Sequence, residues 1–243
     1  MKLNKNNMKY SIFLLITLIC LSSCRVENKE QIKTDKKDSL KNQTKVDSVK
    51  SVYEGWTKYE IDGFGEIIIA PEMEVQKGKY KEMGEKFRKM NGLEGPQIVF
   101  QQSGLNDDES DAKSSYARVI IKTVVEKPGA YERLNNLIAS KSELDETNDL
   151  MKEKLGKMMK KQGMDIVEWY PLEIKIVNGA TALYSSYIRK SVSNPSNVYV
   201  KMYQFHNYDR LHMITFSYRI SEKEKWSNIY DNIISSIKIT EIK

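Results

Sequence analysis

The chain has 243 residues, of which 40% are hydrophobic and 30% are charged. With 39 basic and 33 acidic side chains, 12 glycines and two cysteines, the composition is that of an ordinary folded protein. It excludes a polytopic membrane protein, a collagen-like fibre, a disulfide scaffold and a wholly disordered chain.

The chain begins with the pattern of an export signal. Three lysines in the first nine residues precede the apolar run 12–21, which is shorter than the roughly 20 residues of a membrane-spanning helix. The following Leu21-Ser22-Ser23-Cys24 resembles the lipobox of bacterial lipoproteins. The resemblance implies that residues 1–23 are removed by cleavage between Ser23 and Cys24, and that the Cys24 thiol carries a diacylglycerol. The alternative is a plain secretory signal with an incidental cysteine.

Lipidation of Cys24 would decide both the redox chemistry and the location of the protein. Removing 23 residues from 243 leaves 220, and the only cysteine among them is consumed by the lipid. Disulfides, cysteine nucleophiles and cysteine-ligated zinc then drop out. Two or three acyl chains give a stable membrane anchor. Lipoproteins that are retained in the inner membrane usually carry Asp directly after the cysteine, whereas this chain has Arg25 there. We therefore expect the protein to be anchored in the outer membrane, on either its periplasmic or its surface face.

Residues 24–52 are predicted to form the lipidated end and a disordered tether, because they are polar, contain no aromatic residue and have few apolar side chains. A helix in this segment is the alternative, since it lacks Gly and Pro. The first 52 residues hold 11 basic and 5 acidic side chains, which leaves 28 of each in residues 53–243. The folded part is therefore neutral, and nucleic-acid binding is not expected.

Residues 53–243 are predicted to fold as a single domain of strands and helices. Asp62-Gly63 and Asn178-Gly179 are strong hairpin signals, and Gly163 suits a helix C-terminus. Segment 78–92 is ambiguous, and 103–115 is a polar loop. We expect strands at 56–61, 64–70, 97–102, 116–125, 166–176, 180–189, 198–205 and 213–218, helices at 130–139 and 145–162, and a last helix capped by Ser221 with Glu224.

Consecutive hairpins imply antiparallel pairing, and strands that are apolar on both sides, such as 67–69 and 119–121, imply helices on both faces. The strand pair 56–71, the segment 177–182 and the ending 214–237 resemble the Mog1/PsbP-like family, including DcrB-type bacterial lipoproteins. The resemblance covers about 56–240. It implies an α+β fold, an α/β/α sandwich with a mainly antiparallel twisted sheet covered by helices, and a mostly non-enzymatic role in binding or assembly.

The sequence contains no signature of catalysis or cofactor binding, so we expect no enzyme activity. One constellation could bind a metal ion: His206, Asp209 and His212 surround a short turn and offer three ligands for Zn²⁺ or Cu²⁺ if both imidazoles face each other across a five-residue loop. The alternative is two ordinary hairpin histidines. A one-residue change of register would place the two rings on opposite faces.

Tyrosines are the remaining candidates, because six of them fall on adjacent predicted strands. Tyr buries area yet keeps a polar tip, which suits protein interfaces, although it is also a good strand residue. We expect a partner surface at Tyr199, Tyr203 and Tyr208. The predicted function is a lipid-anchored envelope module that binds a protein partner, acts in assembly or neutralises a toxin; the alternatives are a small-ligand or metal-binding lipoprotein and, third, an enzyme.

Overall fold

The computed structural model describes residues 52–90, 97–192 and 196–242. The predicted signal 1–23, the cleavage site at Ser23 and Cys24, and nearly all of the tether lie outside the described residues. The helices are α2 (Gly78–Met90), α3 (Ser110–Ser114), α4 (Lys141–Lys161), the short 3₁₀ turn η2 (Ile220–Glu222) and α5 (Lys223–Ser236). Within the described ranges, none of these helices combines the length and the apolar character needed to cross a membrane.

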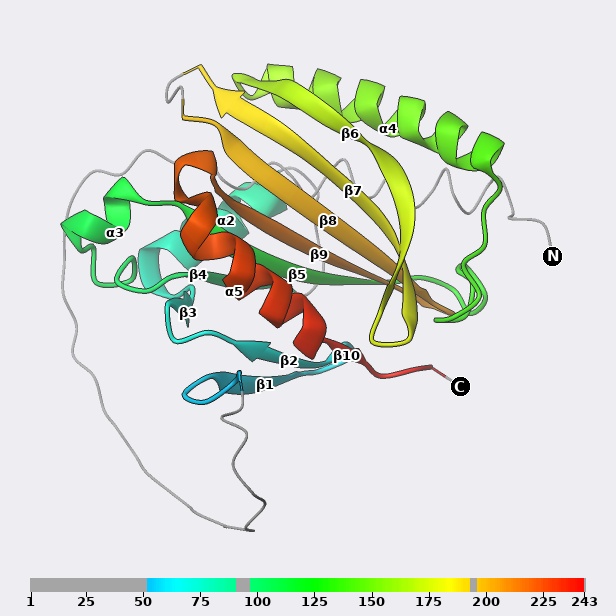
Figure 1. Ribbon diagram of the computed structural model, residues 1–243, viewed down its shortest axis with the longest axis horizontal. Coiled ribbons are helices and arrows are strands. Elements are labelled where there is room, and N and C mark those ends of the chain that lie inside the picture. Colours follow the sequence, from blue (N-terminus) through cyan, green and yellow to red (C-terminus); the bar gives the residue numbers. More distant parts are fainter. Residues whose placement is uncertain (1–51, 91–96, 193–195, 243) are drawn as a thin grey trace, which may run out of the picture.

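Seven strands form one sheet in the order β3-β4-β5-β9-β8-β7-β6 (Figure 1). Every neighbouring pair is antiparallel, which confirms the predicted α+β class with a mainly antiparallel sheet. The turn between β6 and β7 is Asn178-Gly179, with φ angles of 47° and 83°. Positive φ at both positions is typical of the tight turn that matches strand twist. The bounds are β3 (Met73–Val75), β4 (Gln97–Gln102), β5 (Ala117–Val125), β6 (Met164–Val177), β7 (Ala180–Ser191), β8 (Val198–Asn207) and β9 (Arg210–Arg219).

A second, smaller sheet has the order β1-β2-β10. Its strands are β1 (Thr57–Ile61), β2 (Gly65–Ile69) and β10 (Lys238–Ile239), so the C-terminal segment pairs with the first hairpin of the domain. Gly65 makes this pairing feasible: its φ is +132°, and a Cβ there would lie 2.1 Å from the Lys238 carbonyl oxygen. Only glycine allows the two backbones to approach so closely.

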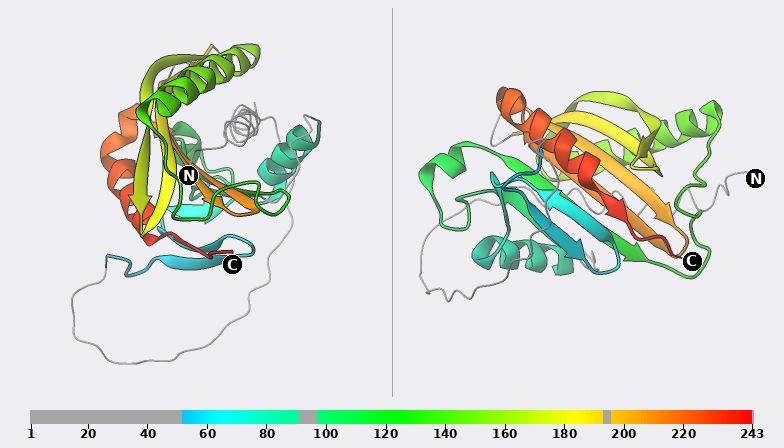
Figure 2. Two further views of the ribbon diagram at one scale, coloured as in Figure 1. Left: turned by 90° about the vertical axis from the view of Figure 1, so that its right-hand side faces the viewer. Right: turned by 60° about the horizontal axis from the view of Figure 1, so that its bottom comes forward.

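The seven-stranded sheet is covered on both faces, as expected for a sandwich. The small sheet and α5 lie on one side, and α4 lies on the other (Figure 2). On the α5 side, Trp226 and Ile233 pack with Phe216 of β9 and with the fully buried Phe64 and Ile67. On the α4 side, a stripe of apolar helix residues packs against the opposite face of β6 to β9; it consists of Met151, Leu155 and Met159. The two sides therefore hold separate hydrophobic cores.

Helix α4 begins earlier than the predicted 145–162 because of a capping box. The Ser140 hydroxyl accepts a hydrogen bond from the Glu143 amide, and the Glu143 carboxylate accepts one from the Ser140 amide. These bonds satisfy donors that a helix start otherwise leaves free. At the other end Gly163 has φ +68°, and its amide donates to the Lys160 carbonyl, so the predicted glycine stop is confirmed.

The prediction of a helix at 130–139 is wrong, because this segment has no regular secondary structure. Its backbone pairs with the β8–β9 turn: the Tyr131 amide donates to the Tyr208 carbonyl at 2.9 Å, and the Tyr208 amide donates to the Glu132 carbonyl at 3.0 Å. A helix over 130–139 would need the Glu132 carbonyl for its own hydrogen bonds. Tertiary contacts thus override the local helical pattern of this stretch.

The predicted cap of the last helix is also wrong, since η2 delays the start of α5 to Lys223. Glu222 occupies the N-cap position, and its carboxylate accepts hydrogen bonds from the Trp226 indole at 2.9 Å and from the Ser115 hydroxyl. Three short elements were missed by the sequence patterns, namely β3, β10 and α3, which lies inside the expected polar loop. The ambiguous segment at 78–92 is the helix α2.

Candidate functional site

The hairpin that carries both histidines turns more tightly than predicted. Asn207 of β8 pairs with Arg210 of β9, which leaves a two-residue loop of Tyr208 and Asp209 in place of the expected five. Tyr208 has φ +65°. Residues other than glycine rarely adopt this left-handed backbone conformation, and they do so where neighbouring contacts stabilise it. Here the hydrogen bonds between Tyr208 and the segment 131–132 supply that support.

The register of this hairpin separates the two imidazoles. His206 lies opposite Leu211, whereas His212 lies opposite Phe205. Directly opposed residues share a face, and side chains alternate along a strand, so His206 and His212 point to opposite faces of the sheet. The two rings therefore cannot bind one metal ion together. Within the described ranges, no group of three His, Cys, Asp or Glu side chains could hold a metal.

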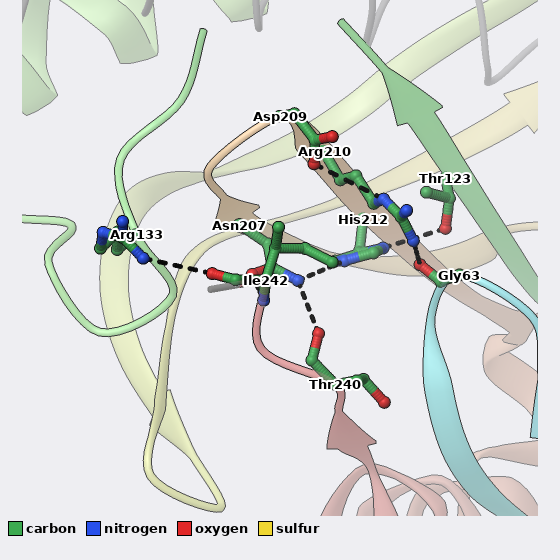
Figure 3. A network of polar contacts seen from close by, with 9 residues as sticks. All are labelled: Gly63, Thr123, Arg133, Asn207, Asp209, Arg210, His212, Thr240 and Ile242. Atoms are coloured by element: carbon green, nitrogen blue, oxygen red, sulfur yellow. Dashed lines mark hydrogen bonds and ion pairs between the residues drawn. The ribbon is translucent and has the colours of Figure 1, made fainter. Parts of the chain in front are cut away.

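His212 is the buried centre of a polar network at the closed end of the hairpin (Figure 3). Its Nε2 lies 3.0 Å from Asn207 Nδ2, and its Nδ1 lies 2.9 Å from the Thr123 hydroxyl. Asn207 also donates from Nδ2 to the Thr240 carbonyl and accepts from the Ile242 amide at Oδ1. These two contacts fix the orientation of the amide, so Nε2 is an acceptor and Nδ1 carries the proton that is donated to Thr123.

The environment of His212 keeps the ring neutral. Its side chain is fully buried, and Phe64 packs against it edge-to-face at 5.4 Å. Burial lowers the pKa of His212 to about 4, and the nearby charge of Arg210 acts in the same direction. A second proton would also place an N–H group against the Asn207 N–H donor. The ring therefore serves as a structural acceptor at neutral pH.

The same network ties the C-terminal segment and the first hairpin to the main sheet. Arg210 donates from a terminal guanidinium nitrogen to the Gly63 carbonyl at 3.0 Å, which holds the β1–β2 turn against β9. Arg133 donates to the Ile242 carbonyl at 3.3 Å and lies over the Tyr208 ring. The polar groups around the hairpin are thus used to join four segments of the chain (Figure 3).

His206, on the other face, holds the segment between β5 and α4. Its Nδ1 lies 2.6 Å from a Glu132 carboxylate oxygen, and both side chains are mostly buried. The hydrogen bond from His206 is the main cause that lowers the Glu132 pKa, against an opposing contribution from burial. The Tyr131 ring packs at 5.4 Å from the imidazole. His206 is therefore committed to this contact, and Asp209 lies beside Arg210 at 3.5 Å.

Two of the three tyrosines predicted to form a partner surface lie on the same face of the sheet, and the third does not. Tyr199 and Tyr203 lie on the α5 side of β8, but Tyr208 sits at the far end of this strand and belongs to the polar network. Tyr170 of β6 joins instead, with its ring 6.1 Å from Tyr199. We call the set the tyrosine face; its members are Tyr170, Tyr184, Tyr199, Tyr203 and Tyr218. Tyr187, also noted in the sequence, stacks on Trp169 on the opposite side of the sheet.

Ring-to-ring packing makes the tyrosine face rigid. The centroids of Tyr184 and Tyr203 are 4.9 Å apart, and those of Tyr199 and Tyr218 are 5.7 Å apart. Burial raises the pKa of Tyr218 to about 12 and raises the pKa of Tyr184 and Tyr203 further. All of these phenols are therefore neutral donors and acceptors at physiological pH.

Charged side chains border the tyrosine face. Lys175 Nζ lies 3.5 Å from the Tyr184 ring centroid, and Lys201 pairs with Asp231 of α5 at 2.9 Å. Tyr170 and Tyr199 are half-buried, while Tyr184 and Tyr203 are only 6% exposed. An aromatic centre with a charged border is the usual composition of a protein-binding surface.

No protein-family model matches the chain, and no curated protein matches it either. Among solved structures, cyanobacterial PsbP (CyanoP) from Synechocystis is 13% identical with a TM-score of 0.43, and the match covers 76% of this chain and 92% of that one. A protein of unknown function from Pseudomonas aeruginosa is 8% identical with a TM-score of 0.38, over 77% of this chain and 99% of that one.

A structure from Bacteroides thetaiotaomicron is 8% identical with a TM-score of 0.43; the match covers 76% of this chain and 48% of that one. The chain thus spans about half the length of this larger protein. At these identities the likeness concerns the fold alone.

Proposed function

We propose that this protein is a lipid-anchored lipoprotein of the bacterial cell envelope that acts as a non-enzymatic protein-binding module. The anchor in this proposal is Cys24, exposed after cleavage of residues 1–23 and lipidated on its thiol. The basic start, the short apolar run and the lipobox-like Leu21-Ser22-Ser23-Cys24 support it. Residues 25–52 would hold the folded domain away from the membrane surface.

The observation that carries the binding role is the tyrosine face. Five tyrosines from four neighbouring strands pack on one side of the sheet, where Tyr170 and Tyr199 are half-buried and Tyr184 and Tyr203 are buried. Tyrosine adds contact area at a small cost in side-chain entropy and keeps a hydroxyl for a partner's polar groups. Such a preformed aromatic surface can bind without reorganisation.

The neutral net charge of the folded part argues against nucleic acid and anionic surfaces as the partner. Residues 53–243 carry 28 basic and 28 acidic side chains, so no net charge steers the domain to nucleic acid or to an anionic surface. We therefore propose an envelope protein as the partner, either in an assembly role or as a toxin that is neutralised. Metal binding at the hairpin is not proposed, because His206 and His212 point to opposite faces.

Site-specific photo-crosslinking on native membranes tests the proposal. A benzophenone amino acid would replace Tyr170 or Tyr199 in the full lipoprotein, and the control would carry it at Lys157, whose side chain on α4 is 71% exposed. We expect one discrete protein adduct from the tyrosine positions and none from Lys157. The adduct should disappear when Cys24→Ala prevents anchoring, and its identity would separate an assembly partner from a toxin.

The opposite outcomes are equally informative. Equal labelling from Lys157 and from the tyrosine face would mean that the contact is unspecific. Absence of any adduct from both tyrosine positions in membranes that contain the anchored protein would refute the tyrosine face as a docking surface. Retention of the adduct in the Cys24→Ala protein would refute the need for the anchor while leaving the surface in place.

A further inference from the structure

Strand β6 forms one edge of the seven-stranded sheet (Figure 1). Among the residues that the structure describes, no strand pairs with its outer side. Its last residues, 173–177, follow the irregularity between Tyr170 and Glu173 and pair regularly with β7 on the inner side. Ile176 in this stretch is 75% exposed. A regular edge that carries exposed apolar side chains is a template for pairing with a further strand.

The hairpin turn fixes which backbone groups of this stretch face outward. Val177 and Ala180 flank the two-residue turn, and the residues at that place in a hairpin exchange both of their hydrogen bonds. Bonded and non-bonded positions alternate along an antiparallel ladder, so Ile174 and Ile176 direct their N–H and C=O groups away from β7. The side chains of both residues project on the α4 side, because Ile174 lies opposite Leu183 of the core there.

Two side chains on the other face of the same stretch carry opposite charges. Glu173 and Lys175 flank Ile174, and their side chains are 58% and 39% exposed. An antiparallel second copy of the strand, centred on Ile174, would place Glu173 of each copy opposite Lys175 of the other. Opposite charges at directly opposed positions stabilise strand pairing, whereas like charges destabilise it. The edge is therefore complementary to itself about a twofold axis.

We infer that two copies of this chain form a symmetric dimer in which residues 173–177 pair antiparallel, with Ile174 opposite Ile174 at the twofold axis. The Ile174 amide of each copy donates to the Ile174 carbonyl of the other, and the two sheets join edge to edge. Pro171, which has no N–H group, lies opposite Val177 of the second copy and ends the pairing. The contact leaves the tyrosine face uncovered, so the inference does not rest on the proposed function.

Disulfide trapping in freshly opened cells that express the full chain tests the dimer. Ile174→Cys places a thiol on the axis, where the two Cα atoms would lie about 5.5 Å apart, within the range of a disulfide. Two Ile176→Cys residues would be about 13 Å apart along the strands, at about 3.3 Å per residue. We expect oxidation by copper phenanthroline to give a covalent dimer from Ile174→Cys alone. Random collisions would instead favour Ile176→Cys, the more exposed position. Wild type is the blank, because residues 52–242 contain no cysteine.

Charge reversal tests the register of the dimer. In the Ile174→Cys protein, Lys175→Glu would place like charges opposite each other twice, so we expect the yield of covalent dimer to fall at least about fivefold. Adding Glu173→Lys makes the charges opposite again and should restore the yield. Lys86→Glu, the same charge change at an exposed position of α2, should leave the yield unchanged.

A fold control separates loss of the dimer from loss of the structure. Ile174 is only partly buried and the two charged side chains are exposed, so each reduced variant should keep the cooperative urea transition of the wild type. In folded variants, four results would overturn the pairing. These are the absence of a dimer from Ile174→Cys, equal yields from both cysteine positions, a yield that does not respond to Lys175→Glu, and no recovery when Glu173→Lys is added.

Discussion

His212 should make the stability of the domain fall steeply with acidification. Its folded-state pKa is about 4, against about 6.5 in an unfolded chain. Above pH 6.5 both states are neutral at this residue and its linkage contribution is fully present. As the pH falls from 6.5 to 4 the unfolded state takes up the proton first, which favours unfolding. The loss is about 2 kcal/mol at pH 5 and levels off at about 3 kcal/mol below pH 4.

Urea unfolding of wild type and His212→Gln between pH 7.5 and pH 3, followed by tryptophan fluorescence, measures this loss. Other acids with shifted pKa values, such as Glu132, titrate in both proteins and cancel in the difference. We expect the pH dependence of the wild type to exceed that of the variant by the amounts above, whatever the absolute stability of the variant. Equal slopes, or an NMR titration in which the folded His212 ring protonates near pH 6.5, would refute the neutral, buried acceptor derived from Figure 3.

Three further substitutions test the packing, each by urea unfolding at pH 7.5. Ser140→Ala removes the capping box of α4 and should cost about 1 kcal/mol; no loss would mean that the box is not formed. Gly156→Ala, at a site in α4 where an added Cβ meets nothing within 4 Å, should stabilise by about 0.5–1 kcal/mol. Gly65→Ala, whose Cβ would strike the Lys238 carbonyl, should destabilise and should free β10 in hydrogen exchange, whereas unchanged protection of Ile239 would contradict the close approach.

Local turn chemistry accounts for most of the fold that could be predicted. Asn178-Gly179 and Asp62-Gly63 each supply positive φ where a hairpin needs it, and the strands on either side follow from their β-branched and aromatic residues. The segment 130–139 shows where such reasoning stops. Its composition favours a helix, but its backbone groups are claimed by the turn at Tyr208, and no local pattern carries that information.

Whether the two histidines could form a metal site depended on a shift of one residue in the pairing of β8 with β9. His206 and His212 are separated by an even number of positions in the sequence, and a longer loop could have placed both rings on one face. The two-residue turn shifts the pairing so that each ring faces a different core. The sequence predicted a cluster of tyrosines on neighbouring strands but not that Tyr170 belongs to it. Tyr170 lies in a stretch of β6 whose pairing with β7 is irregular, so its side of the sheet could not be predicted.

The polar groups at the hairpin are already engaged in holding the C-terminal segment and the first turn, so unused binding capacity remains at the tyrosine face. Strands alternate their side chains between the two faces of a sheet, so Tyr187 and Trp169, which stack on the α4 side, take no part in this surface. A partner that docks on the tyrosine face therefore contacts the side of the sheet that also carries α5.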